Sequence, residues 1–571
     1  MKPRHSFSVV LLAVISFCFA AVLLVLRAVA SPPQSTNRVT LTLLSTTDIH
    51  GHLEPWDYYA NKPADLGLAK IATLVEEVRA EAPHALLLDC GDTIQGTPLA
   101  DYFAEKDTSK PNPTIAAFNA LRYDAMAVGN HEFNFGLPVL WKAKGESRFP
   151  WLAANIRQTY TQGVRFFQPY IIKDVDGVRV GIVGFVTPGI PRWEVPDHYH
   201  GYEFEQIVDA ARKVIPDLRR QVDLLVVIMH SGLGRDPITD TQRDADEISG
   251  ENAALALAEQ VPGIDLIFFG HTHLELSETF VNGVLLTQAK NWGQSLARAD
   301  VVMSRDELGR WRVESKHSQT LPVTPLVPAD PAIMKLAEPY HEAVQKYLDT
   351  PLATSASELT GQYARYEDSP LVDLIHAAQL DASHADVSMA TMFNPSARIP
   401  AGSLTIRQAA SLYVYENTLY VVEMTGAQLK DALEHAAGFF PAWPVPAGQT
   451  LQLPGYNADS AAGVSYVIDL TQPVGRRIRD LQFHGQPLDP AKKLRVAINN
   501  YRYTGGGGYQ VYKGLPTVYQ SSAPIRDLLI AYLQRTRQIP QVPNGNWKIV
   551  PPEALDAIKK AADADLRDHS R

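Results

Sequence analysis

The sequence predicts an α/β protein with a layered first domain and a second, α+β domain. The chain has 571 residues, which is more than one hydrophobic core usually accommodates. From residue 38 to about 300, short apolar runs alternate with amphipathic stretches, a pattern typical of layered strands and helices. A Pro-rich stretch from residue 320 separates this part from a second region with its own strands and helices.

Residues 1–30 have the layout of a secretory signal peptide. Lys2 and Arg4 form a basic start, residues 9–26 are an almost unbroken apolar run, and Ala28-Val29-Ala30 offers a small-residue cleavage site. An uncleaved membrane anchor is the alternative because the apolar run is long. The cleavage site favours removal, so we expect a periplasmic or otherwise extracytoplasmic protein with no membrane attachment. Cys90 would be the only cysteine left, which excludes an internal disulfide.

The first domain is expected over residues 38–320. Continuous apolar runs indicate buried strands at residues 39–46, 85–88, 125–128, 178–186, 223–229 and 264–269. Apolar residues at helical spacing predict helices near residues 68–78 and 207–215. Together these elements predict a layered arrangement around a buried sheet.

The remainder of the chain divides into three parts. Residues 321–355 are expected to form a Pro-rich linker and a helix, with the helix at 332–348. The second domain is expected over residues 356–550, with helices at 371–381 and 427–437 and strands at 419–424 and 494–498. Residues 551–571 are expected to form a charged helical tail.

Polar side chains with metal-binding chemistry follow five of the predicted strands. These residues are Asp48, His50, Asp92, Asn130, His230, His271 and His273. The carboxyl ends of strands line the binding crevice in layered α/β proteins, so we expect these side chains to converge.

Oxygen and nitrogen ligands without thiolate suit zinc, manganese or a similar divalent ion. Seven ligands are too many for one tetrahedral ion but suffice for two ions that share a carboxylate, and Asp92 is the natural bridge. Two such ions clamp a phosphoryl group and activate a water molecule. Each residue alone has an ordinary alternative, such as a helix cap, a turn or a hydrogen-bonded histidine. Five strand ends with this chemistry in one domain favour the metal hypothesis.

The order of these motifs resembles that of calcineurin-like metallophosphatases. The matching stretches are Asp48-Ile49-His50, Gly91-Asp92, Gly129-Asn130-His131-Glu132, His230 and Gly270-His271-Thr272-His273. With its second domain, the chain is similar to the bacterial 5′-nucleotidase family from about residue 40 to 545. The resemblance implies a four-layer αββα sandwich followed by a substrate-specificity domain. It implies one metal held by Asp48, His50, Asp92 and His273 and a second held by Asp92, Asn130, His230 and His271. His131 would then act on the phosphoryl group as a catalytic residue.

Two positions depart from the 5′-nucleotidase pattern. Asn134 stands where those enzymes carry an Asp that orients the catalytic histidine, so it is expected to hold His131 by hydrogen bonding without adding charge. Gly507 stands where they carry an Asp for the ribose hydroxyls. The 2′,3′-cyclic-nucleotide 2′-phosphodiesterase/3′-nucleotidase branch resembles this sequence at Asn134, and it shares residues 57–59, 95–102 and 499–502. The sequence therefore favours that branch.

The second domain offers candidates for substrate binding. Tyr415 and Tyr501 stand where the family places two rings that stack on the base, an interaction worth about 1–3 kcal/mol. Asn394 and Arg398 resemble a substrate loop of the family, and Arg365 is a further candidate because a guanidinium suits phosphate. The ordinary alternatives are core packing for the tyrosines and solvent exposure for the arginines.

These features predict an exported two-metal phosphoesterase that converts 2′,3′-cyclic nucleotides and 3′-nucleotides to nucleoside and phosphate by metal-hydroxide attack. The formal net charge of −10 disfavours polymeric nucleic acid as a partner and leaves a small nucleotide. The alternatives are a 5′-nucleotidase or nucleotide-sugar hydrolase, and a catalytically silent nucleotide- or metal-binding protein. An enzyme of sulfur oxidation on the same frame is disfavoured by the tyrosine pair.

Overall fold

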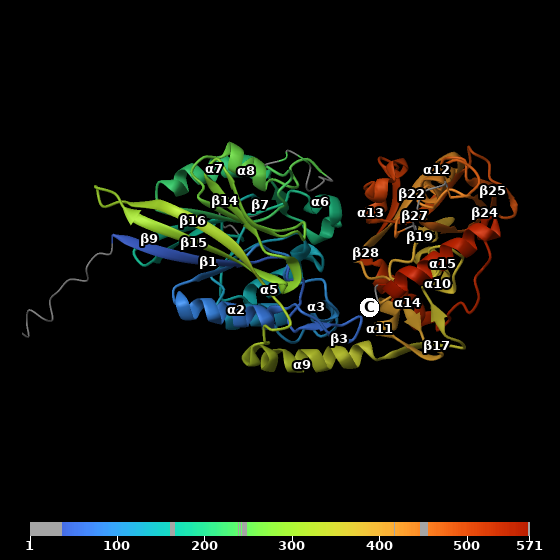
Figure 1. Ribbon diagram of the computed structural model, residues 1–571, viewed down its shortest axis with the longest axis horizontal. Helices are drawn as coiled ribbons and strands as arrows, with labels where there is room; N and C mark the ends of the chain where they lie inside the picture. The colour runs from blue at the N-terminus through green and yellow to red at the C-terminus, as the bar shows by residue number, and fades with distance from the viewer. Residues whose placement is uncertain are drawn as a thin grey trace, which may run out of the picture.

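The computed structural model describes residues 37–568, except for residues 160–165, 238, 240, 242–247, 416, 446–450 and 452–454. The expected signal peptide lies outside these residues. Within them, no helix has both the length and the apolar character needed to cross a membrane. The chain forms two lobes, which Figure 1 shows side by side. The N-terminal lobe runs from β1 (Arg38–Thr46) to β16 (Trp311–Pro322), and the C-terminal lobe runs from β17 (Pro351–Ser355) to α15 (Pro552–Asp568).

Two six-stranded sheets form the centre of the N-terminal lobe. In spatial order the first consists of β16 (Trp311–Pro322), β15 (Ser295–Arg305), β1 (Arg38–Thr46), β4 (Leu86–Asp89), β5 (Ala125–Ala127) and β6 (Trp151–Leu152). The second consists of β13 (Leu276–Val281), β14 (Val284–Gln288), β12 (Leu266–Phe269), β11 (Leu224–His230), β9 (Val178–Val186) and β8 (Tyr170–Val175). Each of the six expected strands is present within two residues of its expected bounds.

The two sheets pack face to face, and helices cover both outer faces. Leu43 and Leu88 of the first sheet belong to one buried cluster with Ile182, Ile228 and Phe268 of the second. The outer face of the first sheet packs against α2 (Leu68–Glu81), α4 (Pro113–Leu121) and α5 (Gly136–Glu146). The outer face of the second packs against α7 (Ile207–Arg219) and α8 (Ala254–Gln260). This arrangement is the four-layer αββα sandwich that the resemblance implied.

The central strands of each sheet run parallel, which brings their carboxyl ends to one edge. In the first sheet β1 pairs with β4, β4 with β5, and β5 with β6, all in parallel register. In the second sheet β11 pairs in parallel register with both β9 and β12. The loops that follow β1, β4, β5, β11 and β12 are therefore brought together along one side of the lobe.

Helix α9 (Pro331–Leu348) connects the lobes. Asp330 caps its first turn by accepting from the backbone N–H groups of Ala332 and Ile333. The helix runs along the edge of the N-terminal lobe and reaches the C-terminal lobe, as Figure 1 shows. It packs against α2 and α4 on one side and against α11 (Ile406–Ala410) on the other.

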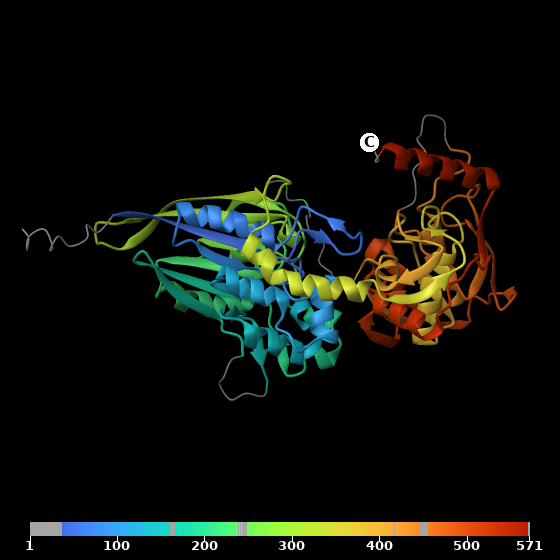
Figure 2. The ribbon, with the colours of Figure 1, turned by 90° about the horizontal axis from the view of Figure 1, so that it is seen from below.

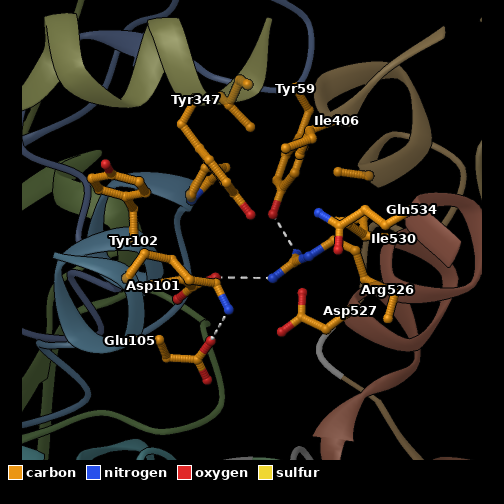
Figure 3. A pocket seen from close by; sticks show the side chains of 15 residues that line it. Tyr59, Asp101, Tyr102, Glu105, Tyr347, Ile406, Arg526, Asp527, Ile530 and Gln534 are labelled. Atoms are coloured by element: carbon orange, nitrogen blue, oxygen red, sulfur yellow. Dashed lines mark hydrogen bonds and ion pairs between the residues drawn. The ribbon is translucent and has the colours of Figure 1, made fainter. Parts of the chain in front are cut away.

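The lobes also meet through a buried arginine. Arg526, at the start of α14 (Ile525–Thr536), donates from Nη2 to the Asp101 carboxylate of the N-terminal lobe at 2.9 Å and from Nη1 to the Tyr59 hydroxyl. Figure 3 shows these contacts beside a pocket between the lobes, with Tyr347 of α9 across from them.

The C-terminal lobe has two sheets of its own. The five-stranded sheet has the order β23 (Ser460–Ala462), β19 (Val387–Ala390), β27 (Lys493–Asn499), β22 (Thr418–Thr425) and β28 (Thr517–Pro524). The four-stranded sheet has the order β26 (Gln486–Pro487), β25 (Ile478–Phe483), β24 (Val464–Asp469) and β29 (Trp547–Val550). Two-stranded pairs form between β17 (Pro351–Ser355) and β21 (Gly402–Thr405) and between β18 (Leu359–Thr360) and β20 (Arg398–Ile399).

Helices complete the C-terminal lobe. Helix α12 (Gly426–Ala437) packs against strands of both larger sheets, and α10 (Pro370–Ser383) packs against β19 and α14. Helix α15 (Pro552–Asp568), expected from the charged tail, lies on one face of this lobe, as Figure 2 shows. The short helix α13 (Asn500–Tyr503) directly follows β27.

We predict that the layer between the two N-terminal sheets dominates the stability of that lobe. Phe268→Ala should lower the free energy of unfolding by about 3–5 kcal/mol, because Phe268 is 1% exposed between the sheets. Phe280→Ala is the matched control: Phe280 is 48% exposed on β13, so its loss should change stability by less than about 0.5 kcal/mol. Urea unfolding followed by circular dichroism measures both, and equal shifts would contradict the layer assignment.

Candidate metal centre

The backbone of the strand-end loops is strained at the candidate ligands. Five of the seven candidates have positive φ: Asp48 (50°), His50 (48°), Asp92 (58°), His271 (80°) and His273 (58°). Residues with a side chain adopt this region at a conformational cost, and such strain concentrates at functional sites. The loops are therefore shaped to direct these side chains, and the surrounding packing maintains them.

The side chains of these loops form three contiguous groups that could hold a metal ion. The groups are Asp48, His50 and His273; His50, Asp92 and His131; and Asp92, His230 and His271, each with its ligand atoms within 4.8 Å of one another. Asp92 and His50 each belong to two of the groups. Six of the seven side chains that the sequence singled out, all except Asn130, thus lie in one continuous cluster.

Asp92 is at the middle of the cluster. Its Oδ2 lies 2.9 Å from His230 Nε2 and 3.8 Å from both His50 Nε2 and His131 Nε2. Its Oδ1 accepts the backbone N–H of His131 at 2.8 Å, which fixes the plane of the carboxylate. Asp92 is therefore placed to contact ions on both sides.

The spacing of the imidazole nitrogens suits coordination. His50 Nε2 lies 3.1 Å from His273 Nε2, and His271 Nδ1 lies 3.2 Å from His230 Nε2. Two nitrogens bound to one tetrahedral ion at 2.0–2.1 Å are about 3.4 Å apart. The observed separations are close to that value, and each pair falls within a different metal group.

The outer nitrogen of three imidazoles is engaged by an acceptor. His50 Nδ1 donates to the Gln95 carbonyl at 3.0 Å, and His230 Nδ1 donates to the Cys90 carbonyl at 2.8 Å. His271 Nε2 lies 3.1 Å from the Glu251 carboxylate, which can only accept. Because each outer nitrogen donates its hydrogen to an acceptor, the inner nitrogen is the one that faces the cluster and can bind a metal ion.

Asn130 supplies a further test of the metal hypothesis. Its Oδ1 is buried and has no hydrogen-bond partner among the described residues. Buried amide oxygens are almost always paired, so this atom is suited to a ligand that the protein itself does not supply. A Cβ at the preceding Gly129 would lie 2.2 Å from Asp92 Oδ1, so only glycine permits this approach. The residues present therefore fit a pair of divalent ions.

The electrostatics of the cluster favour bound positive charge. Burial by itself would raise the pKa of Asp92, but the adjacent His230 and His131 lower it well below its usual range. Burial would lower the pKa of His230, yet the Asp92 carboxylate outweighs it and raises that pKa to about 10. Burial and the neighbouring His273 lower the pKa of His50 to about 3. Without metal, Asp92 is thus anionic and His50 is neutral, whereas His230 carries a proton on its inner nitrogen that a bound ion would displace.

A buried glutamate holds two of the loops together. Glu132 Oε2 accepts the backbone N–H groups of Gly129 at 2.6 Å and Asp92 at 3.0 Å, and Oε1 accepts that of Thr93 at 2.6 Å. The loops after β4 and β5 are therefore tied through one carboxylate. This contact fixes Asp92 and Asn130 relative to each other.

His131 lies at the edge of the cluster and is partly exposed. Its Nδ1 is hydrogen-bonded to Asn134 Oδ1, a contact that can hold the ring in one orientation. Asn134 Nδ2 in turn donates to the carboxylate of Glu194, a residue that no sequence motif indicated. Glu194 lies 60 residues after Asn134 in the sequence, and Glu251 lies 20 residues before His271. Neither glutamate belongs to a motif of fixed spacing.

The aromatic candidates of the C-terminal lobe are on its surface. Tyr415 is 45% exposed, and its ring centroid lies 5.1 Å from that of Phe393 and 6.5 Å from that of Tyr456. Tyr501 is 36% exposed, and its hydroxyl accepts the backbone N–H of Gly507 at 3.0 Å. Partial burial, with contributions from nearby groups that include Tyr501, raises the pKa of Tyr415. Phe393 and Tyr456 were not expected from the sequence.

The other three candidates of this lobe have structural contacts. Arg365 donates to the carbonyls of Met392 at 2.7 Å and Phe393 at 2.8 Å, so its guanidinium supports the backbone beneath Tyr415. Asn394 closes a turn by accepting from Ser396 N and donating to the Ser411 carbonyl. Arg398 forms an exposed ion pair with Glu358 at 3.1 Å. Their roles in substrate binding stay predictions.

We predict that the wild-type protein binds two divalent ions per chain and that Asn130→Ala binds one. The loss follows because Asn130 would supply its unpaired oxygen to one ion only. Dialysis against manganese or zinc followed by mass spectrometry of the metals measures the stoichiometry. His84→Ala, which removes an exposed histidine outside the cluster, should keep two ions. Two ions in Asn130→Ala at limiting metal, bound as tightly as in the wild type, would contradict the assignment.

Comparisons with known proteins agree with this geometry. Two family models match the chain: calcineurin-like phosphoesterase over residues 41–275, and the 5′-nucleotidase C-terminal domain over residues 348–514. The chain is 31% identical to the 2′,3′-cyclic-nucleotide 2′-phosphodiesterase/3′-nucleotidase of Yersinia enterocolitica, covering 90% of this chain and 88% of that protein. It is 30% identical to the trifunctional nucleotide phosphoesterase protein of Bacillus subtilis over 90% of this chain, but it spans only 39% of that longer protein.

A solved structure has the same fold over most of the chain. The 5′-nucleotidase precursor of Thermus thermophilus aligns with a TM-score of 0.58 and 26% identity, covering 90% of this chain and 99% of that one. Both lobes are therefore shared with known nucleotidases. The chain belongs to the 5′-nucleotidase family of phosphoesterases, which joins a calcineurin-like metallophosphatase domain to a C-terminal nucleotidase domain.

Proposed function

We propose that this phosphoesterase is exported and hydrolyses 2′,3′-cyclic nucleotides and 3′-nucleotides to nucleosides and phosphate, using two divalent ions. The observation that carries the proposal is the convergence of the strand-end ligands around Asp92. The named activity of the Yersinia enterocolitica relative supports nucleotides as the substrate class. The basic start and apolar run of residues 1–30 support export.

Asp48, His50, Asp92 and His273 would hold one ion, and Asp92, Asn130, His230 and His271 the other, with zinc and manganese both suited to these ligands. When bound, the ions activate water and offset charge on the phosphoryl oxygens. The protein's own part is to hold these side chains in place.

His131 contributes to the chemistry from the edge of the cluster. Its Nδ1 is held by Asn134, and its Nε2 faces the Asp92 side, 3.8 Å from Oδ2. From this position the ring with hydrogens on both nitrogens can donate a hydrogen bond from Nε2 to a phosphoryl oxygen or give the Nε2 proton to the leaving ribose oxygen. The same residue serves both steps of the proposed reaction, which are opening of the cyclic diester and hydrolysis of the resulting 3′-monophosphate.

The glycine loop of the C-terminal lobe supports substrates whose ribose hydroxyls carry the phosphate. At Gly507, which has φ of 69°, an added Cβ would lie 2.5 Å from both Arg502 Nη1 and Asn457 Oδ1. The neighbouring carboxylate of Asp459 is engaged by Arg502 Nε and Nη2, both at 2.8 Å. The loop therefore offers no side-chain carboxylate at Gly507 for a free 2′,3′-diol.

We expect kcat/KM for 2′,3′-cyclic AMP and 3′-AMP to exceed that for 5′-AMP by about tenfold to a hundredfold, the range that a few pocket contacts supply. Phosphate release from the three substrates, with metal present, measures this ratio. His131→Ala should abolish most of the turnover of all three. A preference for 5′-AMP would replace the assignment with a 5′-nucleotidase, and tight AMP binding without turnover would replace it with a binding protein.

We expect Tyr415→Ala to raise KM for 3′-AMP about tenfold, because base stacking on an aromatic ring is worth about 1–3 kcal/mol. Tyr415→Phe is the matched control and should keep the wild-type KM, since it retains the ring. p-Nitrophenyl phosphate, which has no base, should report no change in either variant. An unchanged KM for 3′-AMP in Tyr415→Ala would remove Tyr415 from the base site.

A further inference from the structure

A carboxylate lies behind the residue that orients His131. Glu194 follows α6 (Ile190–Trp193) and is 8% exposed. One of its oxygens, Oε1, accepts from Asn134 Nδ2, and the other, Oε2, accepts from His198 Nδ1 at 2.7 Å. Four side chains thus form a continuous line of hydrogen bonds from His198 through Glu194 and Asn134 to His131.

The direction of each hydrogen bond in this line follows from the carboxylate. An ionised carboxylate only accepts, so Asn134 must turn its NH₂ group toward Glu194. The amide oxygen then faces His131, and because this oxygen also only accepts, His131 Nδ1 must carry a hydrogen. Donor and acceptor chemistry alone fixes the direction of these hydrogen bonds, whichever atom of the Asn134 amide is assigned as oxygen.

The segment that carries Glu194 is held on three sides. The Trp193 ring centroid lies 5.6 Å from that of His271 in the metal cluster. The Arg192 guanidinium lies 5.0 Å from the ring centroid of Tyr503, in the C-terminal lobe. The His198 hydrogen bond holds the second oxygen of Glu194. A side chain fixed in this way can impose its orientation on a neighbour.

We propose that Glu194 is a positioning residue for His131 and acts through Asn134. It locks the amide so that His131 Nδ1 always keeps its hydrogen. Nε2 is then the nitrogen that takes up a proton and gives it to the leaving oxygen, which returns the ring to its neutral Nδ1–H form. Without an acceptor at position 194, the amide can rotate, donate to Nδ1 and move the hydrogen of the neutral ring to Nε2. This inference rests on the proposed catalytic role of His131. It explains how Asn134 can orient the histidine, although 5′-nucleotidases carry an aspartate at that position.

Glu194→Gln tests the proposal with almost no change in shape. The oxygen of the introduced glutamine can accept from His198 Nδ1, its NH₂ group can donate to Asn134 Oδ1, and Asn134 would then donate to His131 Nδ1. Every group is satisfied, but His131 Nδ1 now accepts. The one hydrogen of the ring then lies on Nε2 and cannot be given to the leaving oxygen without leaving an imidazolate anion. We expect kcat for 3′-AMP to fall about tenfold to a hundredfold, a part of the ~10²–10⁴ that general acid–base catalysis contributes, with KM unchanged.

The double variant Asn134→Asp with Glu194→Gln should restore activity. The introduced glutamine then accepts from His198 and donates to the introduced aspartate. That aspartate accepts the Nδ1 hydrogen of His131, as Asn134 does in the wild type. We expect the kcat of the double variant to return to within a few-fold of the wild-type value. Asp197→Asn, an exposed carboxylate on the same segment, should leave kcat unchanged.

The tautomer of His131 gives a readout that needs no turnover. In metal-free protein with ¹⁵N-labelled histidine, the signal that disappears in His131→Ala identifies this ring, and its nitrogen shifts report which atom carries the hydrogen. We expect Nδ1–H in the wild type and double variant and Nε2–H in Glu194→Gln. Nδ1–H in Glu194→Gln, or a double variant as slow as the single one, would overturn the proposal. A wild type inactive on nucleotides would instead overturn the proposed function, while the tautomer result would still decide the role of Glu194.

Discussion

The N-terminal lobe depends on one constraint: the carboxyl ends of strands from two packed sheets must bring their loops to a common carboxylate, Asp92. The constraint has a cost, because five of the candidate ligands have backbone conformations that residues with side chains rarely adopt. The αββα packing and the Glu132 hydrogen bonds to two loops maintain these conformations. The fold therefore serves as a rigid frame for side chains that would otherwise repel one another or rotate away.

Orientation in this centre is set one contact outside the candidate ligands. The carbonyls of Gln95 and Cys90 and the carboxylate of Glu251 each take the outer hydrogen of an imidazole. Glu194 stands in the same relation to His131, with Asn134 between them. The same rule, in which an acceptor decides where a histidine keeps its hydrogen, thus applies to the metal groups and to the proposed catalytic residue.

Much of the fold could be predicted from the sequence because its central strands are buried on both faces. Strand β9 was expected at residues 178–186 and is observed there, since its apolar run is continuous. Strand β16 was not expected, because it lies at the edge of its sheet and only two of its twelve residues are buried. The candidate ligands could be found because each lies at the end of a strand or within four residues after it. Glu194 and Glu251 could not, because only the folded chain brings them to their partners.

Anomalous X-ray diffraction from crystals grown with manganese or zinc would locate the bound ions. We expect two peaks per chain, about 3.5–4 Å apart, with the Asp92 carboxylate in contact with both. One peak should lie among Asp48, His50 and His273, and the other among Asn130, His230 and His271. A single peak, or two peaks of which either lacks Asp92 as a ligand, would rule out a two-ion centre built on Asp92.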